Sequence, residues 1–121
     1  MTGRSYAPCA VGGTLNAHTI PRLECRIVAG SANNQLAEAE DARRLHERGI
    51  LYAPDYVINA GGVLQLVGLE DRKLDPVALE ATYAGIGDTL RQIFAAGGLP
   101  SEAAERLAAE RIAQKRDEAL T

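Results

Sequence analysis

The sequence has no tryptophan, one phenylalanine and four tyrosines, so aromatic residues make up only 4% of its 121 residues. Proteins that bind single-stranded nucleic acids stack the bases on aromatic side chains, and this chain offers few of them. An excess of positive charge is also lacking, because 13 Lys and Arg residues are set against 16 Asp and Glu residues. The composition therefore argues against a nucleic-acid partner.

Long apolar runs and an export signal are missing as well. No stretch approaches the roughly 18 apolar residues of a membrane span, and the first residues carry no apolar signal-peptide core. We therefore expect a cytoplasmic protein without a membrane partner, in which Cys9 and Cys25 are free thiols. Together with His18 and His46 these cysteines lack the closely spaced ligand pairs of a zinc site, so no bound metal is expected.

What the chain does contain is an alternation of strand and helix patterns. The strand patterns cover residues 5–13, 25–30 and 50–53, and the helix patterns cover 19–23, 36–47, 76–96 and 101–119. Thr19 and Asp55 are the predicted caps of a helical turn and of the helix after the third strand, and Gly49 is a predicted helix stop. The alternation predicts an α/β fold with about three parallel strands, followed by two carboxyl-terminal helices.

Small and polar residues follow each predicted strand, at residues 7–10, 30–34 and 53–55. Ligands of open parallel sheets bind beyond the carboxyl ends of the strands. Because these three ends would share one edge, we predict a rim of small and polar residues that suits a flat, polar ligand.

Several polar residues and glycines near this edge have two interpretations. Asn33 and Asn34 could cap the helix predicted over 36–47 or face a ligand. Asn59 lies in an apolar segment and, if buried, needs a partner from the backbone or from a ligand. The adjacent Gly61 and Gly62 would let another backbone or a flat ligand approach closely.

Residues for covalent or acid–base catalysis are not recognisable. Cys9 has no histidine in a partner motif, so we expect a small rim residue and not a nucleophile. Lys73 and Lys115 lie in polar surroundings and are expected to be solvated. Gly85 and Gly87 resemble the start of a dinucleotide-binding turn, but they lie inside a helix pattern and are interpreted as a packing site.

Three motifs resemble the family of glutamate, leucine, phenylalanine and valine dehydrogenases, most closely its leucine and valine branch. They are Ala-Pro-Cys-Ala with Leu-Asn and Thr-Ile-Pro within residues 7–21, Ala-Gly-Ser-Ala-Asn-Asn-Gln-Leu at 29–36, and Gly-Ile-Leu-Tyr-Ala-Pro-Asp-Tyr-Val-Ile-Asn-Ala-Gly-Gly-Val at 49–63. The resemblance covers about residues 6–112. It implies the carboxyl-terminal part of such an enzyme, with the second half of a Rossmann-like NAD-binding domain at 1–70 and amphipathic helices at 71–121.

The resemblance also implies an activity, which is NAD-dependent oxidative deamination of a branched-chain L-amino acid to a 2-oxo acid and ammonia. The residues that it places beside the cofactor are Pro8, Cys9, Ala10, Asn33 and Asn59. Val63 and Leu66 would line the pocket for the substrate side chain, where an apolar pair fits an aliphatic substrate.

The catalytic lysines and the glycine-rich phosphate turn of that family are not found in these residues, so we expect no catalytic residue here and an inactive isolated chain. Two alternatives follow, a non-catalytic module that self-associates or complements an amino-terminal half, and a truncated remnant. The sequence departs from the family pattern at residues 2–5, before the first strand, and at 67–71, in a loop that looks shortened.

Overall fold

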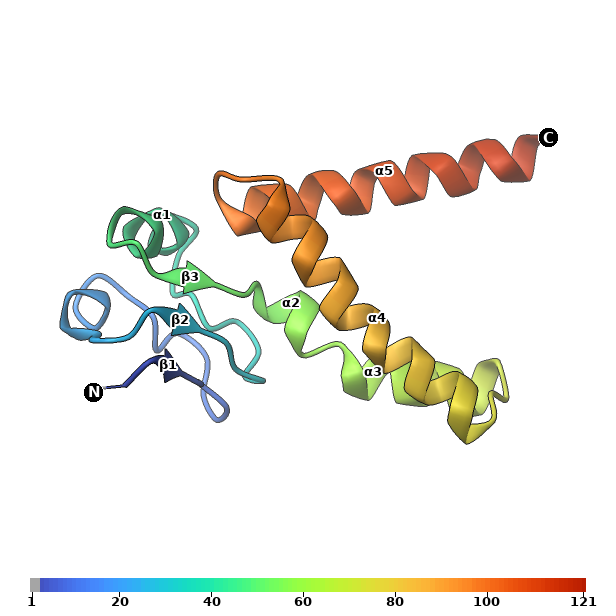
Figure 1. The fold of residues 1–121 in the computed structure, drawn as a ribbon, viewed down its shortest axis with the longest axis horizontal. Helices are drawn as coiled ribbons and strands as arrows, with labels where there is room; N and C mark the ends of the chain where they lie inside the picture. The colour runs from blue at the N-terminus through green and yellow to red at the C-terminus, as the bar shows by residue number, and fades with distance from the viewer. Residues whose placement is uncertain (1–2) are drawn as a thin grey trace.

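Three short parallel strands form the sheet of this protein, whose computed structural model describes residues 3–121 (Figure 1). The strands are β1 (Ser5–Tyr6), β2 (Ile27–Val28) and β3 (Leu51–Tyr52), in the order β1-β2-β3. Ser5 is paired with Ile27, and Ile27 with Leu51, both in parallel register. The α/β fold with three parallel strands is thus confirmed, and β1 forms although its first residue, Ser5, belongs to the stretch 2–5 in which the sequence departs from the family pattern.

One face of the sheet is covered and the other is open. Val28 and Tyr52 belong to the main core with Leu45 of α1 (Glu40–Glu47), and this core also holds Leu15, Ile20, Leu23 and Ile50. Side chains alternate along a strand, so Ile27 and Leu51 point to the opposite face. Each of these two side chains is 39% exposed.

Helix α1 begins four residues later than the pattern predicts, at Glu40 instead of Leu36. Leu36 forms an isolated parallel bridge with Leu15, in which Ala37 N–H donates to the Leu15 carbonyl at 2.9 Å. Backbone pairing with a distant segment therefore takes Leu36 out of the helix, and periodicity alone does not reveal such pairing.

The predicted end of α1 is confirmed. Gly49 has φ of +67°, the left-handed conformation that glycine adopts without strain. Its N–H donates to the carbonyl of His46 at 2.9 Å, and Ile50 N–H donates to that of Leu45 at 3.0 Å. These two bonds form a Schellman motif, which satisfies the last carbonyls of the helix.

The helical turn predicted at 19–23 is the 3-10 helix η1 (Ile20–Arg22). Thr19 occupies the N-cap position, but its side chain does not cap the helix. Its Oγ1 instead donates to the Thr14 carbonyl at 2.6 Å and accepts the Asn16 N–H at 3.0 Å, so it closes the preceding turn.

The second half of the chain is helical. After β3 come α2 (Asp55–Ile58), α3 (Gly61–Leu66), the π-helical turn η2 (Val67–Asp71), α4 (Pro76–Ala95) and α5 (Pro100–Leu120). The two long helices match their predicted limits within one residue. They are joined at Gly97 and Gly98, whose φ angles of +72° and +70° suit glycine. Helix α5 extends away from the sheet, and the C-terminus lies at its far end (Figure 1).

The π-helical turn coincides with the second departure from the family pattern, at residues 67–71. Arg72 N–H donates to the Val67 carbonyl at 3.0 Å, which is the five-residue spacing of a π-helix. Gly68 within it is buried, and a Cβ there would lie 2.7 Å from Leu79 Cδ1 of α4. The missing side chain at Gly68 therefore makes room for Leu79, so that η2 lies close to α4.

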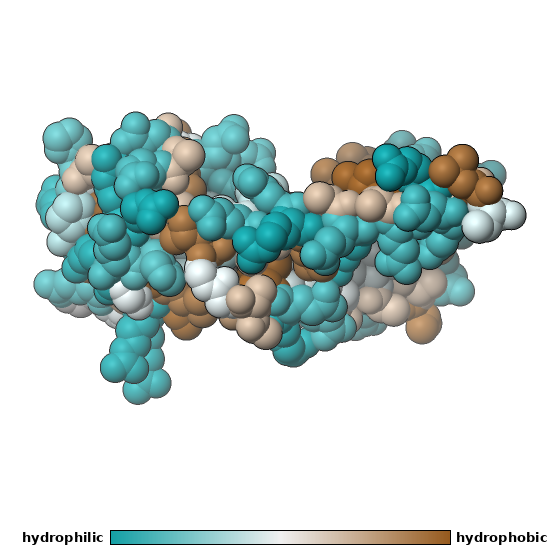
Figure 2. Space-filling model, turned by 90° about the horizontal axis from the view of Figure 1, so that it is seen from above, coloured by the Kyte–Doolittle hydropathy of each residue, from teal (hydrophilic) through white to brown (hydrophobic). Residues whose placement is uncertain are grey.

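The surface seen from above is mainly hydrophilic, with hydrophobic residues showing near its centre and toward the helical end (Figure 2). Ile112 and Leu120 of α5 are 70% and 79% exposed. No helix within residues 3–121 combines the length and the apolar character that crossing a membrane requires.

Candidate functional site

The carboxyl ends of the three strands meet at one edge, as predicted, and we call this edge the rim (residues 7–10, 30–34, 53–55 and Asn59). Ala32 N–H donates to the Pro8 carbonyl at 3.0 Å, which joins the loops after β1 and β2. A Cβ at Gly30 would lie 2.1 Å from that same oxygen, closer than real Cβ atoms approach. The first two rim loops can therefore touch only because residue 30 is glycine.

Gln35 supports the rim from below and was not predicted from the sequence. The residue is completely buried, and its Nε2 donates to the carbonyls of Gly30 at 2.7 Å and Ala32 at 2.9 Å. Its Oε1 is buried without a hydrogen-bond partner among residues 3–121. The sequence signal for this role is that Gln35 directly follows the small and polar residues 29–34, whose backbone carbonyls need hydrogen-bond donors.

Asp55 joins the third rim loop to the second. Its Oδ2 accepts the Gln35 backbone N–H at 2.9 Å and lies 3.4 Å from the Tyr52 hydroxyl, which donates to it. The prediction that Asp55 caps α2 is wrong, because Pro54 takes the N-cap position and Asp55 begins the helix. Burial, followed by the negative charge of Asp55, raises the pKa of the Tyr52 hydroxyl, which stays a hydrogen-bond donor.

Asn33 and Asn59 come together on the rim. Asn59 Nδ2 donates to Asn33 Oδ1 at 2.5 Å, in an exposed position. The partner of Asn59 within the described residues is therefore the side chain of Asn33 and not the backbone. Asn33 and Asn34 do not cap α1, whose N-cap position belongs to Ala39. The contact leaves Asn59 Oδ1 and Asn33 Nδ2 free to meet a ligand.

Asn34 has a conformational role in the same loop. Its φ of +51° lies in the left-handed region, which asparagine tolerates better than most residues. Its carbonyl accepts the Gly13 N–H at 2.7 Å, and a Cβ at Gly12 would lie 2.8 Å from that same oxygen. Asn34 thus turns the loop that presents Asn33.

The residues expected beside the cofactor differ in exposure. Pro8 is buried, whereas Cys9 and Ala10 are exposed. Hydrogen bonds from the side chain and backbone of Ser31 lower the pKa of the Cys9 thiol. Cys9 and Cys25 are both free thiols, as predicted. No group of three His, Cys, Asp or Glu residues is placed to hold a metal ion in the described part of the chain.

Val63 and Leu66, the expected substrate-pocket pair, lie on α3 with side chains 65% and 59% exposed. Asn59 ends the preceding helix α2, so these two side chains belong to a separate helix that begins two residues after it. No atom within residues 3–121 lies within 4 Å of a Cβ built at Gly61 or Gly62. The predicted close approach of another backbone is therefore not observed there.

Gly85 and Gly87 do not pack against a neighbouring segment, contrary to prediction. A Cβ at Gly85 would meet no atom within 4 Å, and one at Gly87 would meet only the side chain of Arg91 at 3.9 Å. Both glycines lie inside α4 and not at a helix N-terminus, so they do not form a phosphate-binding turn.

The chain has an open parallel α/β sheet with a polar rim at the carboxyl ends of its strands. Open α/β sheets form a class of folds in which ligands bind at that edge. The profile of the Glutamate/Leucine/Phenylalanine/Valine dehydrogenase family matches residues 4–70, more than half of the chain. The chain belongs to this family.

Individual relatives agree with the family match. The chain is 49% identical over 115 residues to a valine dehydrogenase of Streptomyces albus and 48% identical over 117 residues to a leucine dehydrogenase of Bacillus subtilis. In each case the match covers 92% of this chain and 31% of the relative. The crystal structure of L-tryptophan dehydrogenase from Nostoc punctiforme superposes with a TM-score of 0.90 at 42% identity, covering 97% of this chain and 36% of that one. The chain thus spans about a third of the length of these relatives.

Proposed function

We propose that this chain carries the nicotinamide- and substrate-facing rim of an NAD-dependent dehydrogenase that deaminates branched-chain L-amino acids to 2-oxo acids and ammonia. The observation that carries the proposal is the Asn33–Asn59 contact at the shared carboxyl edge of the strands, within the residues that match the family. In this proposal residues 1–70 are the second half of a Rossmann-like domain at the carboxyl-terminal end of the enzyme. Residues 71–121 are its carboxyl-terminal helices.

The residues present fit one end of the dinucleotide. Asn59 Oδ1 and Asn33 Nδ2 offer an acceptor and a donor, which the carboxamide or ribose of a nicotinamide nucleotide can satisfy. Pro8, Cys9 and Ala10 are small residues beside them, so a flat ring can approach the backbone. When bound, NAD supplies the acceptor for the hydride that leaves the amino acid.

The pyrophosphate end has no counterpart, because the sequence contains no G-x-G-x-x-G run. Val63 and Leu66, exposed on α3 shortly after Asn59, would contact an aliphatic substrate side chain. Because no catalytic lysine accompanies them, we propose that the 121-residue chain by itself does not turn over. A cytoplasmic location, with Cys9 and Cys25 reduced, belongs to the same proposal.

A binding experiment tests the rim. We expect reduced nicotinamide mononucleotide to shift the amide resonances of Asn33 and Asn59 in 15N-labelled protein, and AMP to leave them unchanged. Asn59→Ala should lose the response, whereas Gln114→Ala, at an exposed site on α5, should keep it. Equal shifts with both nucleotides would contradict the proposal. Formation of NADH from leucine, valine or isoleucine by the purified chain would show that it is active alone.

A second candidate function, as an assembly module, is favoured by the open face of the sheet. Ile27 and Leu51 expose apolar surface there, although parallel sheets are ordinarily covered on both faces. A second copy of the chain or a complementing amino-terminal half would bury this surface.

A further inference from the structure

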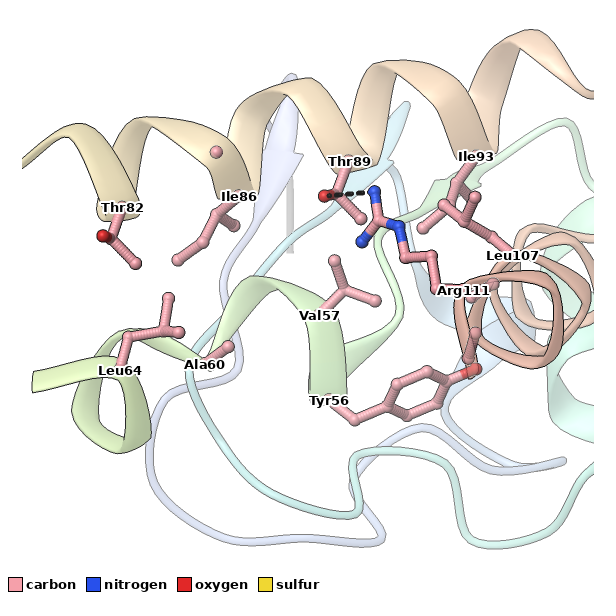
Figure 3. A pocket seen from close by; sticks show the side chains of 13 residues that line it. Tyr56, Val57, Ala60, Leu64, Thr82, Ile86, Thr89, Ile93, Leu107 and Arg111 are labelled. Atoms are coloured by element: carbon pink, nitrogen blue, oxygen red, sulfur yellow. Dashed lines mark hydrogen bonds between the residues drawn. The ribbon is translucent and has the colours of Figure 1, made fainter. Parts of the chain in front are cut away.

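An open groove lies behind the rim, between the segment α2–α3 and the helices α4 and α5 (Figure 3). Its volume is about 430 Å³, within the range of small-molecule sites. Val57, Leu64 and Ile86 point toward one another from α2, α3 and α4, and Ile93 and Leu107 continue the apolar wall. Gly85 adds no side chain to this wall, and the space at its Cβ position is open.

Arg111 of α5 is the one charged residue among those that line the groove. Its guanidinium extends across to α4, where Nη2 donates to Thr89 Oγ1 at 3.3 Å (Figure 3). Within residues 3–121 Arg111 forms no ion pair, whereas Arg91, Lys115 and Arg116 of the same two helices each pair with a carboxylate. The groove therefore presents one uncompensated positive charge beside apolar surface.

The other polar side chains of the groove are already engaged. Thr82 Oγ1 donates to the Ala78 carbonyl at 3.0 Å, and the Tyr56 hydroxyl donates to the Ser101 carbonyl at 3.3 Å. A ligand thus meets apolar side chains and one guanidinium, which lies at Thr89, between Ile86 and Ile93 along α4. No acidic side chain is among those that line the groove. Glu105 lies near its Tyr56 end, where burial and then the charge of Glu105 raise the pKa of the Tyr56 hydroxyl.

We propose that this groove is a binding site for an aliphatic monocarboxylate of medium chain length. The hydrocarbon chain runs from the guanidinium toward Thr82 and lies against Val57, Ile86 and Leu64, where its burial is favourable. The carboxylate binds the guanidinium of Arg111, whose planar fork matches two carboxylate oxygens. The inference does not depend on the proposed function, because it uses neither Asn33 nor Asn59.

Calorimetric titration of the 121-residue chain with sodium decanoate, below micelle formation, tests the site. We expect saturable binding with one site per chain, and at least tenfold weaker binding of decyltrimethylammonium, which carries the opposite charge. Arg111→Gln should weaken decanoate binding about tenfold, and Arg111→Lys should recover most of it. Absence of saturable binding, or equal affinity for both amphiphiles, would overturn the proposal, as would an unchanged affinity in Arg111→Gln.

A pair of glycine substitutions locates the ligand. Gly85→Leu fills the groove and should abolish decanoate binding. Gly87→Leu has the same effect on helix propensity in α4 but does not line the groove, so it should bind decanoate as the parent does. Both replacements favour the helix, so loss of binding in Gly85→Leu alone cannot be attributed to unfolding. Equal binding by the two variants would overturn the assignment. So would a parent chain that is a dimer in solution while Gly85→Leu alone is a monomer, because a second copy of the chain would then occupy the groove.

Discussion

At the scale of single residues, two rim positions have measurable consequences. Gly30 allows another backbone segment to approach, and the surroundings of Cys9 lower the pKa of its thiol. Gly30 lies against Pro8 so closely that no side chain fits between them. Cys9, the next residue along that loop, is exposed, and Ser31 lowers the pKa of its thiol.

Gly30→Ala should destabilise the fold strongly. The added Cβ would lie 2.1 Å from the Pro8 carbonyl oxygen, so the two loops must separate and lose the Ala32–Pro8 hydrogen bond. We expect the free energy of unfolding to fall by about 3 kcal/mol, the upper part of the range for overpacked sites. Urea denaturation measures this change.

Gly62→Ala is the matched control, because a Cβ at this exposed position in α3 meets no atom within 4 Å. Its effect should be neutral or a gain below about 1 kcal/mol, since alanine favours a helix over glycine. A similar loss of stability in both variants would contradict the close approach at Gly30.

The Cys9 thiol should react faster at neutral pH than an ordinary thiol. Hydrogen bonds from Ser31 lower its pKa, so more of it is thiolate at any pH below its ordinary pKa, and the thiolate is the nucleophile. The rate of alkylation by iodoacetamide, followed against pH in a Cys25→Ala background, reports this pKa. Ser31→Ala should shift the profile to higher pH, and an unmoved profile would show that Ser31 does not stabilise the thiolate.

At the scale of elements, α1 is held at its start by a buried carboxylate. The Asp41 side chain is completely buried, accepts the Glu38 N–H at 2.9 Å and contacts Arg44 Nη1 at 2.6 Å. Glu38 and Asp41 both raise the pKa of the Arg44 guanidinium, so their contacts favour its charged form. Elsewhere in this helix, Arg43 and Glu40 form an exposed pair at 3.4 Å.

Asp41→Ala should lower the free energy of unfolding by about 1.5–3 kcal/mol, because it removes two hydrogen bonds in which a charged group takes part. Glu40→Ala, which removes only the exposed pair, should change it by less than about 0.5 kcal/mol. Thermal denaturation of both variants gives the comparison. Equal effects would mean that burial of Asp41 does not strengthen its contacts.

The long helices could be predicted almost to the residue, whereas the short elements could not. Helices α4 and α5 contain many apolar residues at helical spacing and both begin at a proline, and glycines follow α4, so local signals suffice. Leu36 carries the same helical spacing, yet it pairs with Leu15. Asp55 and Thr19 are good capping residues, yet their oxygens bind groups outside their helices. Local propensity is weak compared with such tertiary contacts.

At the scale of the whole molecule, the sheet leaves one apolar face open. If this face mediates self-association, light scattering should give a mass above 12.9 kDa that rises with concentration. Replacing Ile27 and Leu51 together by threonine retains residues suited to a strand and should return the mass toward that of one chain.

Val11→Thr is the control for that experiment, since Val11 is 69% exposed but lies outside the sheet. Its mass should match that of the parent chain at every concentration. A constant mass of one chain for the parent, across the same concentrations, would remove the support for an assembly module.

The sequence by itself determined the α/β class, the sharing of one edge by three polar loops, the end of α1 at Gly49, the two long helices and the family. These properties follow from periodicity, from glycine and proline at chain turns, and from motifs read in order. Only the tertiary structure showed that Asn59 meets Asn33, that Gln35 and Asp55 support the rim, and that Arg111 lies over an apolar groove. The reason is physical, because these contacts join residues that are distant in sequence, and a side chain's partner is set by how the elements pack.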